Sequence, residues 1–148
     1  MSEILWCADN GDGTYRNPVL YCDYSDPDAI CVNGTYYLTA STFNYVPGLP
    51  ILTSRDLVNW KLRNYAVKNI PEARYAAPQH AQGIWAPAIR FQNGRFYIYY
   101  GMPDEGIYMV STENPLGDWD SPVLVKPGKG LIDPCPFWDD DGLSLIHI

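Results

Sequence analysis

The stretches DAICVNGTYYLTAS (residues 28–41) and PAIRFQNGRFYIYYG (residues 87–101) share one design. In each, a short run of β-branched and aromatic residues is followed by Asn-Gly and then by a second such run. Asn-Gly is a strong signal for a β-hairpin with a primed turn, because both central residues must adopt positive φ. We therefore predict two antiparallel hairpins, whose turns at Asn33-Gly34 and Asn93-Gly94 lie about 60 residues apart.

Each hairpin is followed by two further segments that favour β-strands. A third strand is expected at 49–54 (LPILTS) in the first unit and at 106–111 (GIYMVS) in the second. A fourth segment contains a tryptophan in both units: VNWKL at 58–62 and GDWDSPVLV at 117–125. Prolines and glycines interrupt nearly every window that is long enough for a helix. The sequence thus predicts two four-stranded antiparallel units in tandem.

Tandem four-stranded units of this length are typical of β-propeller blades. A third unit begins at IDPCPFWDDDG (132–142), where Asp141-Gly142 takes the place of Asn-Gly. A propeller hides its sheet edges by closing a ring of four or more blades. We therefore expect an all-β propeller fold, of which this chain supplies roughly two blades and the start of a third.

The last six residues, LSLIHI (143–148), are what a transposase adapter used in sequencing libraries encodes. The segment is also apolar and compatible with a second strand of the third unit. We favour the adapter and leave 143–148 out of the predicted fold. The expected organisation is an N-terminal extension at 1–16, a partial propeller at 17–142, and this six-residue scar.

Composition argues against several classes of function. The formal net charge is −7, and the ten lysines and arginines form no basic cluster, which disfavours nucleic acid or an anionic membrane as the main partner.

No apolar run approaches the length of a membrane span, and MSEILWCADNGDG lacks the layout of a signal peptide, so a cytoplasmic protein is expected. The four cysteines show no CxxC spacing and are expected to be reduced and structural. Neither a cofactor nor a metal site is predicted.

The residues that open the first strand of each unit fall into register when the units are aligned on their turns. These openings are Ser25-Asp26-Pro27, Trp85-Ala86-Pro87 and Ile132-Asp133-Pro134. The innermost strands of a propeller begin near its axis, so these side chains should converge on one pocket. Proline at the first residue of a strand sacrifices no ladder hydrogen bond and fixes the backbone beside the acid. Two carboxylates beside an indole are typical of glycosidases, which need paired acids and a flat ring for the sugar.

Several long motifs resemble glycoside hydrolase family 43, which includes β-xylosidases and α-L-arabinofuranosidases. They are SDPDAI (25–30), STFNYVPGLPILTSRDLVNW (41–60), GIWAPAIR (83–90), NGRFYIYYG (93–101) and GLIDPCPFWDDDG (130–142). The resemblance runs from about Asn17 to Gly142. It implies a five-bladed β-propeller that hydrolyses glycosides derived from xylan or arabinan with inversion at the anomeric carbon.

The resemblance also implies roles for two of the acids. The general base of the family maps onto Asp26, and the aspartate that orients the general acid and tunes its pKa maps onto Asp133. The family's general acid is a glutamate in a later blade, commonly in a Glu-Gly-Pro setting, and no such motif occurs in this sequence. We therefore expect the 148-residue chain to be inactive alone and to associate through its open sheet edge. Asp23 and Asp28 are expected to satisfy turn and backbone donors instead.

Three further side chains are candidates for contact with a sugar. Trp85 could provide a stacking platform or serve as a core indole, and Phe43 resembles an aromatic residue of the family's pocket. His80 could hydrogen-bond sugar hydroxyls or simply lie on the surface. The tryptophans of the fourth segments, Trp60 and Trp119, are expected to pack in outer strands.

Three functions remain open at this point. The first is a β-xylosidase, and the second is an α-L-arabinofuranosidase that uses the same chemistry on another sugar. The third is a propeller that binds oligosaccharides without cleaving them, but such a protein has no need of both Asp26 and Asp133 at its axis. The expected partner in every case is a xylo- or arabino-oligosaccharide. The sequence leaves the oligomeric state open.

Overall fold

The computed structural model describes residues 6–140, 142 and 144–147. The first sheet has the order β1 (Asp28–Val32), β2 (Thr35–Thr39), β3 (Gly48–Ser54) and β4 (Lys61–Val67). The second sheet has the order β5 (Trp85–Gln92), β6 (Arg95–Met102), β7 (Gly106–Thr112) and β8 (Val123–Pro127). A third, two-stranded sheet pairs β9 (Cys135–Trp138) with β10 (Ser144–His147). A 3-10 turn, η1 (Ala73–Ala76), lies between β4 and β5.

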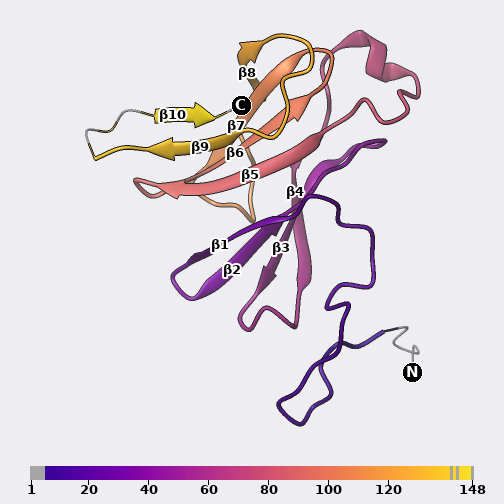
Figure 1. Cartoon of the computed structure of the whole chain (residues 1–148), viewed down its shortest axis with the longest axis vertical. Coiled ribbons are helices and arrows are strands. Elements are labelled where there is room, and N and C mark those ends of the chain that lie inside the picture. The colour runs from indigo at the N-terminus through magenta and orange to yellow at the C-terminus, as the bar shows by residue number, and fades with distance from the viewer. Residues whose placement is uncertain (1–5, 141, 143, 148) are drawn as a thin grey trace.

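Both predicted hairpins are confirmed. Val32 pairs with Thr35 across the first turn, and Gln92 pairs with Arg95 across the second. Asn33 and Asn93 each have a φ of 50°, and the glycine after each also has positive φ, as a primed two-residue turn requires. The units that we call blade one (β1–β4) and blade two (β5–β8) are therefore meanders in which each strand pairs with the next (Figure 1).

The tryptophans of the fourth segments do not lie in the outer strands as predicted. Trp60 precedes β4, and Trp119 precedes β8. Each indole Nε1 donates to a backbone carbonyl of the preceding loop, that of Leu57 at 2.9 Å and that of Pro115 at 3.2 Å. The two indoles thus close the loops that lead into the outer strands, and Trp119 also packs against the core.

The main apolar core lies between the two blades, which face one another across it in Figure 1. Both sheets supply its buried side chains: Leu49, Ile51, Ala66, Val67, Ile84, Ile89, Phe96, Ile98, Tyr100, Met102, Tyr108 and Val110. Burial of apolar surface contributes about 25 cal/mol per Å², so the contact between the blade faces stabilises their packing. Outer strand β8, by contrast, is exposed along its whole length.

A short backbone seam joins the blades at the end where their inner strands begin. The amide of Thr42 donates to the carbonyl of Ile84 at 3.0 Å, and the amide of Ile84 donates back at 3.1 Å. The amide of Gly83 donates to the carbonyl of Phe43 at 2.9 Å. This seam fixes Phe43 of blade one beside Trp85, the first residue of β5.

The third unit packs against blade two through an aromatic contact. The ring of Trp138 in β9 lies 5.1 Å from that of Tyr97 and 6.3 Å from that of Tyr99, both in β6. Residues 144–147, which we left out of the predicted fold as part of an adapter scar, pair with β9 as strand β10. This pairing agrees with the compatibility of the segment with a second strand, noted from its sequence. The turn residue Asp141 lies outside the described residues.

Two further predictions concern cysteines and membranes. All four cysteines are free and exposed. Their exposure does not fit the structural role that we expected, and their reduced state stays a prediction. The described residues contain no helix with the length and apolarity that crossing a bilayer requires.

The seam yields a first prediction, because a side chain at Gly83 has no room. A Cβ atom there would lie 2.7 Å from the carbonyl oxygen of Thr42 and 2.8 Å from that of Phe43. We expect Gly83→Ala to lower the free energy of unfolding by about 1–3 kcal/mol, the usual cost of overpacking. Urea denaturation followed by tryptophan fluorescence measures it. If the neighbours could simply move aside, alanine would stabilise the chain by about 0.4–1 kcal/mol, so an unchanged or higher midpoint would contradict the prediction.

Candidate active site

The three strand openings converge on one hollow, as the alignment of the units predicts. We call it the axial hollow; its volume is about 450 Å³. All three units contribute to its lining, which consists of Ser25, Asp26, Phe43, Ala81, Trp85, Ala86, Ile132 and Asp133. Residues 25 and 133 are far apart in sequence, and only the packing of successive blades brings them together. The two acids selected from the sequence therefore share one solvent-accessible space.

The backbone has the same unusual conformation at each opening. The residue before the proline has positive φ in all three: 48° at Asp26, 32° at Ala86 and 55° at Asp133. Left-handed backbone is uncommon outside glycine, is better tolerated by aspartate than by most residues, and is further disfavoured before proline. Strain of about 1–3 kcal/mol per residue persists only where the surrounding structure imposes it, and it clusters at functional sites.

Hydrogen bonds fix the carboxylate of Asp26 on one side. The hydroxyl of Ser41 donates to its Oδ2 at 2.7 Å, and the hydroxyl of Ser25 donates to the same oxygen at 3.1 Å. Ser41 Oγ also accepts from the backbone amide of Ala86 at 2.8 Å, so it links the acid to blade two. The described residues supply no donor to Oδ1 of Asp26, which leaves that oxygen for a water or a sugar hydroxyl.

Ser41 is a site residue that the sequence analysis missed. It is only 6% exposed and lies two residues after the end of β2, within the motif STFNYVPG. Its hydroxyl is the hydrogen-bonded link between the opening of β1 and the opening of β5. The sequence contained a signal, since a serine closes the first hairpin beside the strand opening, but serines in loops are too common for it to stand out.

Asp133 lines the same axial hollow, next to Ile132. It is exposed, and within the described part of the chain its carboxylate has no hydrogen-bond partner. The following residue, Pro134, is buried and leads into β9. An exposed acid on a fixed backbone can act on a ligand through its charge.

The aromatic side of the axial hollow is formed by Trp85 and Phe43. Their ring centroids are 5.4 Å apart with planes at 85°, an edge-to-face contact that holds both rings. The indole Nε1 of Trp85 donates to the carbonyl of Ala81 at 3.0 Å, so the ring is anchored at its polar edge. His80 is exposed and is not among the residues that line the hollow, so its role in binding stays a prediction.

Asp28 satisfies backbone donors, as predicted, and also does more. Its carboxylate accepts from the amides of Ala29 at 3.0 Å and Ile89 at 2.9 Å, and from Nη1 of Arg90 at 2.6 Å. Burial alone would lower the pKa of Arg90, but the hydrogen bonds and charges of Asp28 and Cys135 together raise it. Asp23 is exposed, and its predicted role in a turn stays a prediction.

Arg90 extends this contact to the third unit. Its Nε donates to the carbonyl of Pro136 at 3.3 Å, and its Nη2 lies 3.4 Å from Sγ of Cys135. One guanidinium thus connects the inner strands β1, β5 and β9, although the sequence analysis did not select it.

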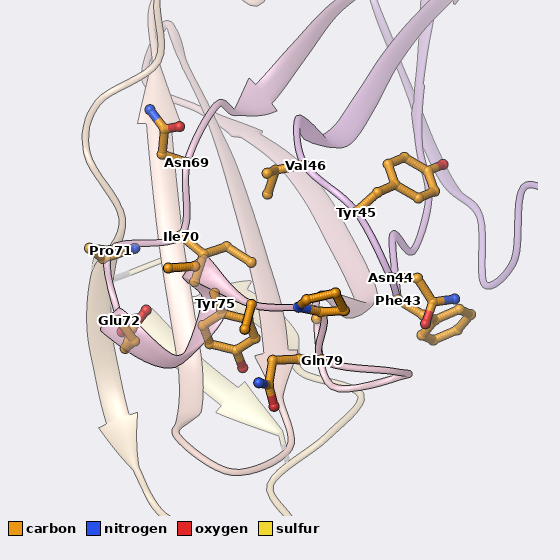
Figure 2. Close-up of a pocket in the computed structure, with 14 residues that line it drawn as sticks. Phe43, Asn44, Tyr45, Val46, Asn69, Ile70, Pro71, Glu72, Tyr75 and Gln79 are labelled. Atoms are coloured by element: carbon orange, nitrogen blue, oxygen red, sulfur yellow. The ribbon is translucent and has the colours of Figure 1, made fainter.

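A second hollow of about 440 Å³ lies beside the first and is drawn in Figure 2. We call it the lateral hollow. It lies between the β2–β3 loop at 43–46 and the connection from β4 to β5 at 69–83. Phe43 lines both hollows. Among the described residues, no three histidine, cysteine or acidic side chains gather as metal ligands.

Comparison with known families matches residues 15–146 to the glycosyl hydrolases family 43. A putative beta-xylosidase of Xylanibacter ruminicola is 45% identical over 140 residues, which cover 94% of this chain and 26% of the relative. A non-reducing end alpha-L-arabinofuranosidase of Bacteroides ovatus is 38% identical over 138 residues, covering 88% of this chain and 26% of that protein. The chain therefore spans about a quarter of the length of these relatives.

Solved structures agree with the arrangement of the blades. The GH43 BlXynB protein from Bacillus licheniformis superposes with a TM-score of 0.78 at 33% identity, over 89% of this chain and 28% of that one. An alpha-L-arabinanase of Cellvibrio cellulosa, solved with arabinohexaose, gives a TM-score of 0.67 at 27% identity, over 84% of this chain and 44% of that one. The predicted all-β propeller fold is thereby confirmed. The chain belongs to glycosyl hydrolase family 43, and its two four-stranded sheets are blades of that family's β-propeller.

Proposed function

We propose that the protein, with its propeller complete, is an inverting exo-glycosidase that removes xylose from xylan-derived oligosaccharides. The observation that supports it most directly is the axial hollow, in which Asp26 and Asp133 face one space beside Trp85. Inverting hydrolysis needs one carboxylate to activate water and another carboxyl group to protonate the leaving oxygen, on opposite faces of the sugar. The name beta-xylosidase recurs among the relatives, which favours xylose as the sugar removed.

In this proposal Asp26 is the general base. Its free Oδ1 accepts a proton from a water, and the oxygen of that water forms a bond to the anomeric carbon. The bond from that carbon to the leaving oxygen breaks, and a carboxylic acid supplied from outside these 148 residues gives the oxygen a proton. Ser41 and Ser25 keep the base in place through Oδ2. Asp133 would orient that acid and raise its pKa by its negative charge.

An α-L-arabinofuranosidase is the second candidate. It would use the same two aspartates, and the Bacteroides ovatus relative bears that name. A non-catalytic binding propeller is less well supported, because the relatives bear the names of glycosidases.

Removing the proposed base should abolish turnover. In the complete propeller, we expect Asp26→Ala to lower kcat on an aryl β-xyloside by about 10²–10⁴, the contribution of a positioned general base. Azide needs no deprotonation, so it should restore part of the rate and form a glycosyl azide of inverted configuration. The matched control is Asp23→Ala, three residues earlier and exposed, which should keep the wild-type rate. Retention of more than a few per cent of activity by Asp26→Ala would remove it from the role.

Asp133 should set the alkaline side of the pH profile. A nearby anion raises the pKa of the general acid, which must be protonated to act. Asp133→Asn should therefore lower that pKa and move the basic limb of kcat/KM to lower pH. The control is Asp139→Asn, an exposed acid in the third unit that does not line the axial hollow. A basic limb that stays in place would refute the electrostatic role.

The 148-residue chain alone should show no turnover. It contains the proposed base but only two full blades, and the third unit leaves apolar side chains such as Phe137 60% exposed. We expect light scattering to show association and assays on aryl β-xylosides to show no product. A clean monomer with xylosidase turnover would contradict both expectations.

A further inference from the structure

The lateral hollow lies at the same end of the blades as the axial hollow. Because β1 and β2 are antiparallel, the loop after β2 lies beside the opening of β1. The connection 69–83 leads from β4 into the opening of β5. The two segments that line the lateral hollow are therefore those that flank the strand openings.

We propose that the lateral hollow binds the leaving-group part of the oligosaccharide, the neutral sugar units beyond the cleaved bond. The inference rests on the proposed function, because it requires the terminal sugar to occupy the axial hollow. It assigns to this connection a role in choosing long substrates over short ones.

The two hollows share a wall. Phe43 lines both, and neighbouring residues of one turn are divided between them, with Gln79 on the lateral side and Ala81 on the axial side. Figure 2 shows Phe43 and Tyr45 on one side of the lateral hollow and Ile70, Tyr75 and Gln79 on the other. In this proposal the sugar chain passes from the axial hollow to the lateral hollow beside the ring of Phe43.

The lining suits an uncharged carbohydrate. It combines aromatic rings and apolar carbon with three amide side chains, those of Asn44, Asn69 and Gln79. Lysine and arginine are not among the lining residues. The one acid, Glu72, accepts a hydrogen bond from the hydroxyl of Tyr108 through Oε1, and its Oε2 is buried without a partner among the described residues. Sugars are bound by flat rings against their apolar faces and by a few polar groups for their hydroxyls.

Some of the polar groups are available to a ligand. Within the described residues, the side-chain amide of Asn69 has no hydrogen-bond partner. The side-chain Oδ1 of Asn44 accepts from the backbone amide of Ala81 at 2.6 Å, and the side-chain Nε2 of Gln79 donates to the backbone carbonyl of Arg74 at 3.0 Å. One hydrogen-bonding atom of each of these two amides therefore holds the loop, and the other can meet a sugar hydroxyl.

Ion pairs and hydrogen bonds hold the connection in place, although its only regular element is one 3-10 turn. Arg74 pairs with Asp104 at 2.8 Å and with Glu105 at 2.6 Å, both in the β6–β7 turn. The hydroxyl of Tyr75 donates to the carbonyl of Gln82 at 2.7 Å. Burial and the neighbouring Glu105 raise the pKa of Tyr75 to about 12, so that hydroxyl keeps its proton. A preformed pocket loses little conformational entropy when it binds, which favours affinity.

The test compares two unactivated substrates in the complete propeller: methyl β-D-xyloside, which has no sugar for the lateral hollow, and β-1,4-xylotriose. We expect Tyr45→Ala and Asn69→Ala each to lower kcat/KM for xylotriose about tenfold, equivalent to ~1.4 kcal/mol. The value for methyl xyloside should stay unchanged. The matched control is Tyr15→Ala, because Tyr15 and Tyr45 are both 57% exposed but Tyr15 lies in the N-terminal arm.

A second variant fills the hollow instead of emptying it. Ala77 is exposed and lines the lateral hollow, so Ala77→Trp should leave the fold intact and exclude xylotriose selectively. If kcat/KM for both substrates is unchanged in all these variants, the inference is wrong, although the proposed function stands.

A protein that hydrolyses neither substrate would refute the proposed function instead. Calorimetric titration with xylotriose would then decide the inference by itself. Binding that weakens about tenfold in Tyr45→Ala and Ala77→Trp, but not in Tyr15→Ala, supports the lateral hollow as a sugar site. Equal binding by all variants overturns it.

Discussion

The guanidinium group of Arg90 is the contact on which the arrangement of the blades depends. It joins Asp28 of β1 to its own strand β5 and to the carbonyl of Pro136 in β9. Asp26 lies two residues before Asp28, and Asp133 lies three residues before Pro136. A partly buried ion pair with additional hydrogen bonds resists small displacements, because separating the charges would leave each without compensation. Arg90 of blade two is therefore the side chain that links the inner strands before which the two acids lie.

Two further contacts fix the position of blade one relative to blade two. The apolar faces of the blades set their distance, and the seam between Thr42 and Ile84 sets their offset along the strands. Phe43 and Trp85, which flank the seam, are consequently held edge to face. General acid–base catalysis depends on geometry before pKa, so a rigid frame of this kind is what two carboxylates need in order to work on one bond.

Local sequence was sufficient for the strands and for the choice of acids. Asn33 and Asn93 predict their turns because few residue pairs other than Asn-Gly adopt positive φ at both central positions. Asp26 and Asp133 were selected because each lies before a proline at the opening of a repeated unit. Ser41, Arg90 and the lateral hollow could not be found in this way. Their importance arises from partners that are distant in sequence, and no local pattern encodes such pairings. Ala86 bonds to Ser41 from 45 residues away, and Asp28 pairs with Arg90 from 62 residues away. Trp60 and Trp119 were placed one element too late because a tryptophan that closes a loop has the same composition signal as one in a strand.

The left-handed residue before each proline has a consequence for how such a ring can diversify. The same turn accepts aspartate in blade one and in the third unit, and alanine in blade two. The main chain thus has the same conformation at all three openings whichever side chain it carries. Neighbouring hydroxyl and guanidinium groups then determine the hydrogen bonding and the charge environment of that side chain. Duplicated blades can therefore exchange an ionisable side chain for a small one without redesign of the scaffold, and a ring of near-identical parts can acquire an asymmetric centre.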